Sequence, residues 1–337
     1  MKIKSIEIKN FRSIKDAIIE MSDFNILVGQ NNCGKTNFFE AVDLFYNGVP
    51  KKVDINSLKF KHDTSLEIKV SISFSDCQEG ASKMKNEKNK VSILKAIGDS
   101  DEITIIRSSL NLKKRTVFVN GTEVNPGTGF DTALNDFLPK FEYVNTKQYY
   151  DSVAKYASTT PMGIMLSGVL SEIVASNQKY KEFQEKFNEL FSDDQSEIKV
   201  EFNKVGQSVK TYLEKQFPDC TKVNFEVTIP AFDDLLKNFN TSIDDGVETD
   251  AEEKGDGMQR ALMLAIIQAY SDFRKQNDDS GKSFLFFIDE AELHLHPSAQ
   301  RKLKDVLLSL SKENDQVFIN THSSVFIADN DPIQTIF

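Results

Sequence analysis

The chain has 337 residues and a formal net charge of −10, with 39% hydrophobic and 27% charged residues. These values predict a folded protein of one large domain or two smaller ones and exclude an intrinsically disordered chain. The negative charge argues against a protein that coats DNA with its whole surface, but it does not exclude a local basic groove.

Cysteine usage and the short apolar runs favour the cytoplasm. Cys33, Cys77 and Cys220 share no C-x-x-C spacing, which argues against a structural zinc site or a disulfide framework. The longest strictly apolar run, residues 261–267, has seven residues and is too short to span a bilayer. The N-terminus lacks an apolar signal core, so we expect neither export nor a membrane anchor.

The N-terminal residues predict a strand–loop–helix unit. Residues 2–10 alternate between apolar and polar side chains, and residues 24–28 form a continuous apolar run, so both segments are expected to be strands. The second strand leads into the glycine loop GQNNCGKT at residues 29–36. Apolar side chains then recur at helical spacing, at Phe38, Ala41, Val42 and Phe45.

Further strands and then helices are expected along the middle of the chain. The expected strands cover residues 66–74, 102–110, 116–124, 141–145 and 223–230, with a hairpin turn at Asn120–Gly121. Between about residues 162 and 216, apolar residues recur every three or four positions, interrupted by a turn at 192–196. This pattern predicts a helical hairpin, with arms of roughly 30 Å for about 20 residues each. It forms either a subdomain with its own core or a dimerisation surface.

The last third predicts an α/β arrangement. An acidic segment at 244–253, expected to be a solvated loop, precedes a glycine-rich turn that opens an amphipathic helix. Residues 284–288 and 316–320 are expected to be strands that flank a helix at 298–312, an order typical of parallel pairing. Residues 331–337 look like the start of another strand, which suggests that a further domain follows.

The glycine loop matches the phosphate-binding pattern G-x-x-x-x-G-K-[ST]. Gly29 and Gly34 let successive backbone N–H groups point inward at a phosphate, and the helix beginning near Lys35 adds its partial positive charge. In this pattern Lys35 bridges the β- and γ-phosphates, and the hydroxyl of Thr36 ligates Mg²⁺. Because the loop follows an expected strand and opens an expected helix, we predict an ATP site.

The stretch FLFFIDEAELHLHP, at residues 284–297, supplies the acids that such a site needs. A buried strand ends in Asp289, which we expect to hold Mg²⁺ through water, and the adjacent Glu290 is the expected general base. Glu292, His294 and His296 could instead form an independent metal site. Their spacing is not H-E-x-x-H on a helix, and zinc would compete for the same acids, so structural or nucleotide-proximal roles are favoured.

Three separated blocks of the chain together resemble one family. The N-terminal strand with its glycine loop, the segment GDGMQRALML and the pair FIDEAELHLHP and INTHSS resemble ABC-type ATPases of SMC-like and RecF-like repair proteins. They look most like the ATPase part of the OLD (overcoming lysogenisation defect) nucleases, whose relatives include Gabija-type phage-defence proteins. This resemblance implies an α/β P-loop ATPase of the ABC type with mixed sheets and an inserted helical hairpin for dimerisation.

The resemblance also implies site residues. Arg12 would lie beside the nucleotide, Gln148 would contact the magnesium ion, and His322 would sense the γ-phosphate. The expected catalytic residues are Glu290, Lys35 and His322. A signature segment would reach across a dimer interface to the partner's γ-phosphate, through Gly255, Asp256, Gly257, Gln259 and Arg260. The expected nucleotide-binding loop residues are Gly29, Asn31, Asn32, Cys33, Gly34, Lys35, Thr36 and Asn37. The expected magnesium ligands are Thr36, Asp289 and Gln148.

Two positions depart from the family pattern. Met258 stands where SMC-type signatures carry a second glycine, and Ala291 replaces a proline common after the paired acids. The side chain of Met258 argues against tight contact between the signature segment and a γ-phosphate, whereas the change at Ala291 is expected to be harmless.

These observations give an expected domain plan and function. We expect residues 1–160 and 218–337 to form the ATPase and residues 161–217 to form the inserted hairpin. The protein would bind ATP and Mg²⁺, form a homodimer or a higher oligomer, and gate an attached or associated Toprim-type nuclease, in defence against phage. The alternatives are a DNA-repair or chromosome-maintenance clamp without a nuclease, and a nucleotide-binding scaffold with little turnover. Basic segments at 83–95 and 113–115 are candidates for DNA contact, or are solvated loops.

Overall fold

The computed structural model divides the chain into two compact units. One contains Met1–Ser152 and Ala251–Phe337, and the other contains Val153–Asp250. The structure describes residues 1–50, 52–124, 127, 129–144, 177–193, 196–230, 232–236, 239–277, 282–293, 295–312, 315–327 and 334–336, together with scattered positions between 154 and 174.

The first sheet of the larger unit is antiparallel throughout and contains the N-terminal strand. Its strand order is β2-β1-β4-β5-β6-β7. The strands are β1 (Lys2–Phe11), β2 (Ile14–Glu20), β4 (Lys69–Ser75), β5 (Ile103–Ser108), β6 (Asn111–Val119) and β7 (Thr122–Val124). The predicted turn between β6 and β7 is confirmed, since Asn120 and Gly121 both have positive φ, as a tight hairpin turn requires.

The second sheet is parallel and carries the strand ends that matter for function. Its order is β13-β3-β12-β11-β8. The strands are β3 (Phe24–Val28), β8 (Lys140–Val144), β11 (Phe284–Asp289), β12 (Gln316–Thr321) and β13 (Gln334–Ile336). Every residue of β11 and β12 is buried, as expected for parallel strands covered on both faces. Because β3, β12 and β11 are neighbours and run the same way, their carboxyl ends meet at one edge.

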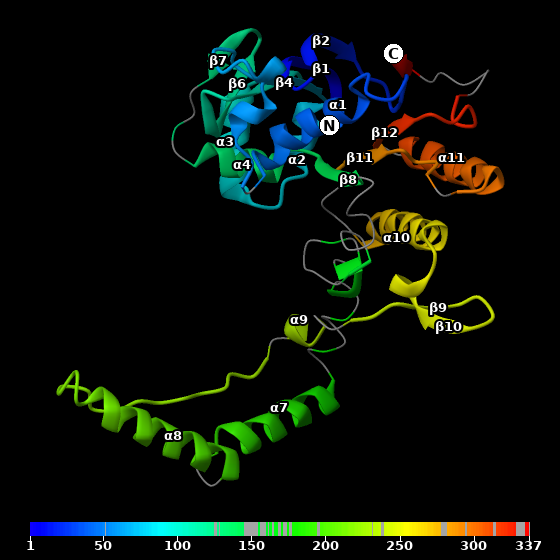
Figure 1. The fold of residues 1–337 in the computed structure, drawn as a ribbon. Coiled ribbons are helices and arrows are strands. Elements are labelled where there is room, and N and C mark those ends of the chain that lie inside the picture. The colour runs from blue at the N-terminus through cyan, green and yellow to red at the C-terminus, as the bar shows by residue number, and fades with distance from the viewer. Residues whose placement is uncertain are drawn as a thin grey trace. The chain divides into compact units, whose positions relative to one another are not determined.

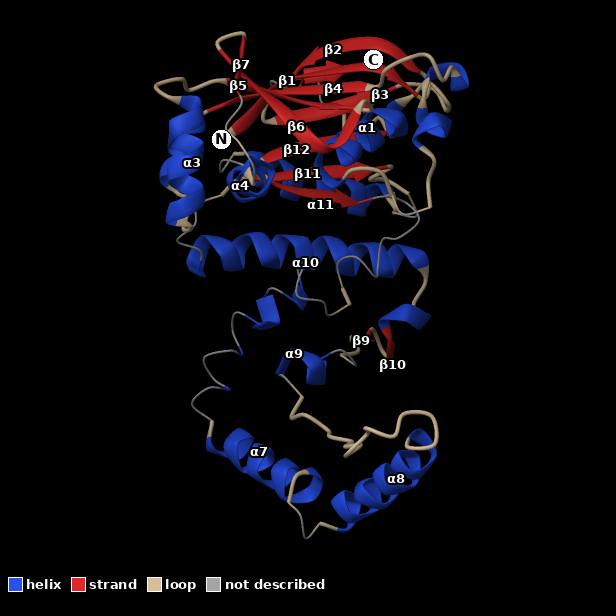
Figure 2. Cartoon of the chain, turned by 90° about the vertical axis from the view of Figure 1, so that its left-hand side faces the viewer, coloured by secondary structure: helices blue, strands red, loops and turns tan. Residues whose placement is uncertain are grey.

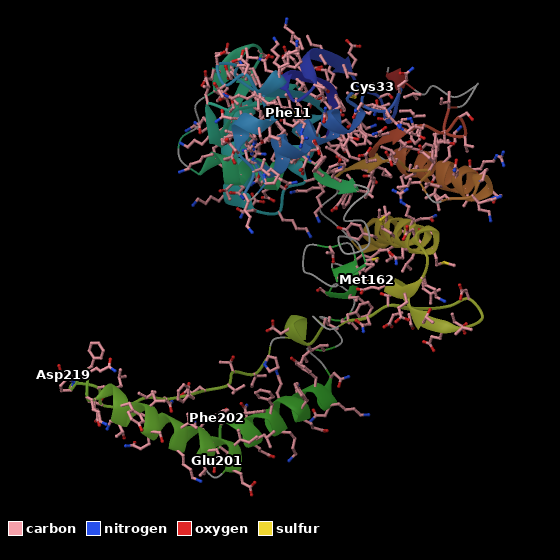
Figure 3. The ribbon with its side chains drawn as sticks, viewed as in Figure 1. Phe11, Cys33, Met162, Glu201, Phe202 and Asp219 are labelled. Atoms are coloured by element: carbon pink, nitrogen blue, oxygen red, sulfur yellow. The ribbon has the colours of Figure 1, made fainter. Side chains whose placement is uncertain are left out.

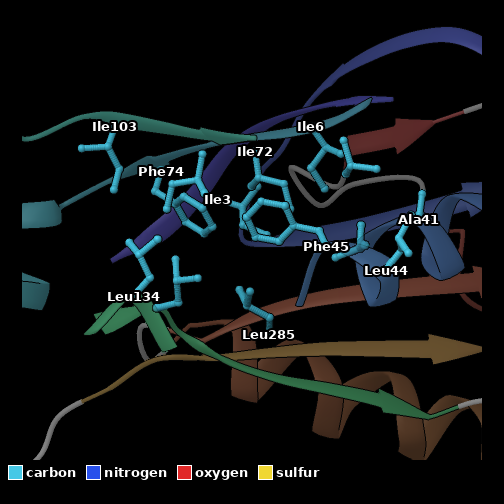
Figure 4. Close-up of a cluster of buried hydrophobic side chains, with 14 of the residues drawn as sticks. Ile3, Ile6, Ala41, Leu44, Phe45, Ile72, Phe74, Ile103, Leu134 and Leu285 are labelled. Carbon is cyan, nitrogen blue, oxygen red and sulfur yellow. The ribbon is translucent and has the colours of Figure 1, made fainter. Parts of the chain in front are cut away.

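Helix α1 (Lys35–Asn47) packs between the two sheets. It contacts β1 and β4 of the antiparallel sheet and β8 and β11 of the parallel sheet (Figure 2). Its apolar side chains, including Ala41, Leu44 and Phe45, meet side chains of both sheets in one buried cluster (Figure 4). This packing fixes the start of α1, and with it the glycine loop, relative to the parallel sheet.

The remaining helices of the larger unit cover the sheets. Helix α11 (Pro297–Ser311) packs on β12, and the long helix α10 (Asp256–Asn277) packs against α11. Three shorter helices are α2 (Cys77–Ser82), α3 (Glu87–Ile97) and α4 (Phe130–Phe137), and 3₁₀ turns lie at Ile55–Leu58, Phe60–His62 and Ala251–Glu253. Among the described residues, no helix is both long enough and apolar enough to cross a membrane.

The smaller unit contains two long helices joined by a short turn. Helix α7 (Gln178–Phe191) and helix α8 (Glu197–Leu213) contact each other, on either side of the predicted turn (Figure 1). Along α7, Phe183, Phe187 and Phe191 form consecutive ring contacts. The described part of the unit also contains helix α9 (Phe232–Leu235) and a hairpin of β9 (Ser242–Asp244) and β10 (Glu248–Asp250). Figure 3 marks Glu201 and Phe202 on α8.

Two local predictions for this unit were wrong. Residues 223–230 belong to no strand, and Val223 and Phe225 of this segment instead lie close to Gly206 of α8. A Cβ atom at Gly206 would come within 2.6 Å of the carbonyl oxygen of Val223, so the missing side chain at Gly206 makes room for the segment. The acidic segment at 244–253 includes β10 and a 3₁₀ turn and is therefore not simply a loop.

Candidate active site

The glycine loop connects β3 to α1, as predicted, and the backbone conformation at Gly34 requires glycine. Gly34 has a φ of 107°, and a Cβ atom there would come within 2.9 Å of the Ser13 hydroxyl oxygen. A Cβ atom at Gly29 would come within 2.7 Å of the Cys33 sulfur. Any larger residue at Gly34 would combine an unfavourable backbone conformation with a clash. The loop therefore keeps its curl only with glycine at Gly34.

Lys35 turns its ammonium group into the loop. Only 9% of the residue is exposed, and Nζ donates hydrogen bonds to the carbonyl oxygens of Gly29 (2.8 Å) and Gln30 (2.9 Å). The positive charge therefore lies at the centre of the curve that the loop describes. A hollow of about 240 Å³ opens beside it. The residues that line this hollow are Asn31, Asn32, Gly34, Lys35, Thr36, Asn37, Glu290, Asn320 and His322.

Thr36 and Asn320, which line the hollow, form a hydrogen-bonded group with Asp289. The Thr36 hydroxyl donates to Oδ2 of Asp289 at 3.0 Å, and the side-chain amide of Asn320 donates to Oδ1 of the same carboxylate. Asp289 is 3% exposed, and this burial raises the pKa of its carboxyl above the ordinary range. The hydrogen bonds from Thr36 and Asn320 and the charge of Lys35 act in the opposite direction, and the charge of Glu290 adds to the rise.

This group fits a magnesium ion. Mg²⁺ prefers oxygen ligands and is commonly held by one or two carboxylates, a hydroxyl and phosphate oxygens. Thr36 and Asp289 offer a hydroxyl and a carboxylate side by side, and the side-chain oxygen of Asn320 is buried with no hydrogen-bond partner among the described residues. The predicted partner Gln148 lies outside the described residues.

Glu290 and His322 also line the hollow, on the strand ends next to the loop. Glu290 follows β11 with a φ of 47°, in the left-handed region that costs a non-glycine residue about 1–2 kcal/mol. The main-chain oxygen of Glu290 is held by the guanidinium of Arg260 at 2.8 Å. His322 is exposed, and its backbone N–H donates to Oε1 of Glu292 at 2.5 Å. The two expected catalytic side chains thus start from fixed backbone positions.

Arg12 lies near the loop but not among the residues that line the hollow. Its guanidinium pairs with Glu40 of α1 at 2.8 Å, and its backbone, with a φ of 49°, donates to the carbonyl of Leu58. The neighbouring Ser13 accepts a hydrogen bond from the side chain of Asn37 at 2.7 Å. The corner between β1 and β2 is therefore fastened to the first turns of α1.

The predicted signature segment lies apart from this hollow. Gly255 is exposed, and Asp256 and Gly257 open α10. Gln259 donates to the carbonyls of Glu252 and Lys254, both at 2.9 Å. The structure thus does not bring the segment to the chain's own hollow.

Within that segment, Arg260 faces inward. It is 4% exposed and donates to the carbonyls of Glu290 at 2.8 Å and Leu293 at 2.7 Å. Arg260 therefore supports the turn after β11.

The residues of the segment ELHLHP, at positions 292–297, make separate contacts. Glu292 accepts hydrogen bonds from the Thr321 hydroxyl and from the backbone of His322, and His296 caps α11 through the backbone of Ser298. His294 lies outside the described residues. Among the residues that are described, no group of three or more His, Cys, Asp and Glu side chains could hold a metal ion.

A second, smaller hollow lies on the other side of the loop. It measures about 150 Å³ and shares Gly34 and Lys35 with the first hollow. Its other lining residues are Ile14, Ala17, Ile19, Leu27, Cys33 and Phe38. The lining is mainly apolar, in contrast to the polar first hollow.

These features define a class of protein. A parallel strand, a glycine loop with an inward lysine, a helix and a neighbouring strand that ends in an acid are the parts of a P-loop nucleoside triphosphatase. The chain belongs to the AAA ATPase domain family, whose model matches residues 1–151 and 106–327.

Characterised relatives support the resemblance found in the sequence. The chain is 30% identical to the Old nuclease of Escherichia phage P2 over 97% of its length and covers 57% of that protein. It is 24% identical to the endonuclease GajA of Bacillus cereus over its full length and covers 58% of that protein. The predicted similarity to the ATPase region of OLD nucleases is confirmed. The chain spans less than two thirds of these relatives.

Solved structures confirm the fold. A structure of an SMC head bound to the C-terminal winged-helix domain of ScpA superposes with a TM-score of 0.55, at 18% identity, over 99% of this chain and 93% of that one. This identity shows a shared fold and nothing finer. The predicted α/β P-loop fold with mixed sheets, of the SMC-head type, is therefore confirmed.

Proposed function

We propose that this chain binds ATP with Mg²⁺ in the hollow beside the glycine loop and hydrolyses it to ADP and phosphate. The observation that supports this proposal best is that two separate segments of the sequence meet here: Lys35, Thr36 and Glu290 line one hollow, and the Thr36 hydroxyl donates a hydrogen bond to Asp289. A chance glycine turn would not be joined to an acid-ended strand by a threonine–carboxylate hydrogen bond.

The two hollows divide the nucleotide between them. The polar hollow suits the β- and γ-phosphates, because Lys35 and the start of α1 supply positive charge there. The apolar hollow beyond Gly34 suits the flat face of a nucleobase. Lys35 borders both hollows, so the two sites are adjacent.

The side chains then divide the chemistry. Thr36, Asp289 and the proposed ligand Gln148 would hold a magnesium ion that neutralises charge on the β- and γ-phosphates. Glu290 would take a proton from the attacking water while the water oxygen bonds to the γ-phosphorus and the bond to the β-phosphate oxygen breaks. His322 would donate a hydrogen bond to the γ-phosphate. Arg12, which is paired with Glu40 of α1, would lie beside the nucleotide.

Replacing Glu290 tests whether the chain hydrolyses ATP. Glu290→Gln should lower ATP turnover at least about 100-fold, the lower end of what a positioned general base contributes, while ATP still binds. Glu87→Gln, an exposed change on α3, is the control and should hydrolyse ATP at the parent rate. A parent protein that binds ATP but releases no phosphate would support the scaffold alternative, and one that binds no ATP would overturn the proposal.

We also infer that the inserted helices, predicted at 161–217, form a dimer contact. Apolar side chains stand exposed on both helices, with Leu190 at 51%, Val205 at 51% and Tyr212 at 68%. Exposed apolar patches of this kind mark protein interfaces. Leu190→Glu with Val205→Glu should halve the mass measured by light scattering, whereas Lys204→Glu, on the polar face of α8, should not. A monomeric parent protein would contradict the inference.

In such a dimer, Gly255, Asp256, Gly257 and Gln259 would face the nucleotide of the other subunit, so that ATP closes the dimer. We propose that this closure gates an attached or associated nuclease in phage defence, because the relatives that the chain matches are named nucleases and are longer. A DNA-maintenance clamp is the rival, favoured by the shared fold with SMC heads. Sequencing the native gene beyond codon 337 for a domain rich in acidic metal ligands separates the two.

A further inference from the structure

Two buried asparagines lie at opposite ends of the parallel sheet. Asn25 is the second residue of β3 and is 0% exposed, and Asn320 is the second-to-last residue of β12 and is 1% exposed. Burying a primary amide is costly unless its oxygen and its nitrogen both find partners. We therefore compare the hydrogen-bond partners of the side-chain oxygen and nitrogen in the two residues.

Asn25 satisfies both ends of its amide. Its Oδ1 accepts hydrogen bonds from the backbone N–H of Ser22 at 2.9 Å and from the Ser22 hydroxyl at 3.3 Å. Its Nδ2 donates to the carbonyls of Ser22 at 2.8 Å and Val317 at 3.4 Å. These contacts tie β3 to its own lead-in and to β12, so Asn25 is a structural residue.

Asn320 satisfies one end only. Its Nδ2 donates to Oδ1 of Asp289 and to the Thr36 hydroxyl oxygen at 3.4 Å, while its Oδ1 is buried without a partner among the described residues. A buried carbonyl left without a donor costs about 1–3 kcal/mol. The preceding residues of β12, Val317, Phe318 and Ile319, are apolar, so an apolar residue would suit the strand equally well.

The register of the sheet places Asn320 beside the proposed metal ligands. Asn320 is the direct partner of Asp289 on β11 and of Leu27 on β3, and it lines the same hollow as Thr36 and Glu290. Its amide nitrogen therefore contacts both groups that would hold magnesium, and its buried oxygen belongs to a residue that lines that hollow.

We propose that Asn320 is a positioning residue of the magnesium site, which rests on the proposed ATPase function. Its amide nitrogen fixes the Asp289 carboxylate against Thr36, and its carbonyl oxygen accepts a hydrogen bond from a water molecule bound to the ion. Groups that orient metal ligands in this way typically change metal affinity or activity about 10–100-fold when they are removed.

The test compares nucleotide binding with and without magnesium. Fluorescent mant-ADP would be titrated into the full chain in EDTA and in saturating Mg²⁺, and the ratio of the two dissociation constants measures how strongly the ion supports binding. Asn320→Leu keeps the volume of the side chain and removes both polar ends. We expect EDTA binding within about twofold of the parent protein and a magnesium ratio at least tenfold smaller.

Asn25→Leu is the matched control, since it is an equally buried asparagine on the same sheet. It should lower the thermal midpoint and leave the magnesium ratio unchanged. Asn320→Ser, which is smaller and still polar, answers the question if Asn320→Leu does not fold, and it should also reduce the ratio.

The outcomes separate this inference from the function on which it rests. A folded Asn320 variant with the parent's magnesium ratio overturns the positioning role, and so does a variant that loses binding equally in EDTA and in Mg²⁺. A parent protein that binds no mant-ADP overturns the proposed nucleotide site and this role with it. A parent protein that binds mant-ADP equally well in EDTA and in Mg²⁺ keeps the nucleotide site but overturns the proposed magnesium site and this role.

Discussion

One carboxylate oxygen of Glu292 accepts a hydrogen bond from the backbone N–H of His322 at 2.5 Å, and the other accepts a hydrogen bond from the Thr321 hydroxyl at 2.6 Å. The next residue, Ser323, donates to the side chain of Gln300 on α11 at 2.6 Å. These contacts fasten the segment after β12 to the turn after β11. The direction in which His322 enters the hollow therefore depends on Glu292.

Removing this carboxylate should loosen His322 and slow turnover. Hydrogen bonds to a charged group contribute about 1.5–3 kcal/mol, so Glu292→Ala should lower ATP turnover about tenfold or more, while nucleotide affinity changes less than about threefold. Glu292→Gln keeps a side-chain oxygen acceptor and should retain more activity than Glu292→Ala. Steady-state phosphate release and mant-ADP titration give the two numbers. Equal losses in turnover and in affinity would argue against a role through His322.

Cys33 offers a chemical probe of the loop. It is exposed, whereas Cys77 is fully buried, and this burial raises the pKa of the Cys77 thiol to about 12. A maleimide should therefore label Cys33 quickly and Cys77 slowly, because the thiolate is the reactive form. Mg·ATP should slow labelling of Cys33 about tenfold or more by covering the loop.

Cys220, in the other compact unit, is the internal control for this labelling. Its rate should not respond to nucleotide, and peptide mass spectrometry reports all three sites in a single sample. Slowing of Cys220 to the same extent as Cys33 would show a general effect of ATP on the protein and would remove the support for binding at the loop.

Local patterns predicted most of the site. These patterns are features of short segments, so they can be recognised without knowing the fold. They are the apolar run before Gly29, the spacing of Gly34 and Lys35, and the acids after residues 284–288. Asn320 could not be found in this way. A polar residue near the end of an apolar strand becomes informative only when the order β3-β12-β11 places it against Asp289.

The wrong strand at 223–230 has a similar cause. Alternation of apolar and polar residues predicts a strand, but a strand also needs a partner with free backbone groups. The structure instead lays this segment against α8, where Gly206 leaves space for the backbone of Val223. A glycine in the middle of a helix was the available signal. Arg260 was likewise assigned to a nucleotide across the dimer from its motif alone, whereas its contacts lie with the turn after β11.

The buried carboxylate of Asp289 should make stability depend on pH. Its folded pKa is raised by burial, so between the unfolded and folded values the native chain binds more protons than the unfolded chain. The contribution of the Asp289 carboxyl to the free energy of unfolding is therefore largest at low pH, and it is lost as the pH rises through the pKa of the folded state. Asp289→Asn, which carries no charge, should therefore be more stable than the parent protein at pH 7.

Thermal unfolding without nucleotide, between pH 4.5 and 7.5, measures this effect. The midpoint should rise by about 2–4 °C for each kcal/mol gained, and the advantage should shrink toward acidic pH, where the parent carboxyl is also protonated. Asp16→Asn, an exposed change on β2, should leave the midpoint unchanged. A variant that is less stable than the parent at pH 7 would mean that the hydrogen bonds of Asp289 outweigh its burial.

Arg260 supplies the last prediction, because one guanidinium holds two carbonyls of the turn that carries Glu290. Both hydrogen bonds come from Nη1, which the planar guanidinium holds in place, whereas lysine keeps the charge on a flexible chain without this fixed placement. Since Glu290 has a left-handed backbone, loss of this support should let the turn relax and move the carboxylate. Arg260→Lys should lower the free energy of unfolding by about 1.5–3 kcal/mol and turnover at least about tenfold, with Arg301→Lys on the exposed side of α11 as the control. Denaturant unfolding and phosphate release measure both effects, and a variant that loses stability but keeps the parent's turnover would show that Arg260 supports the fold without positioning Glu290.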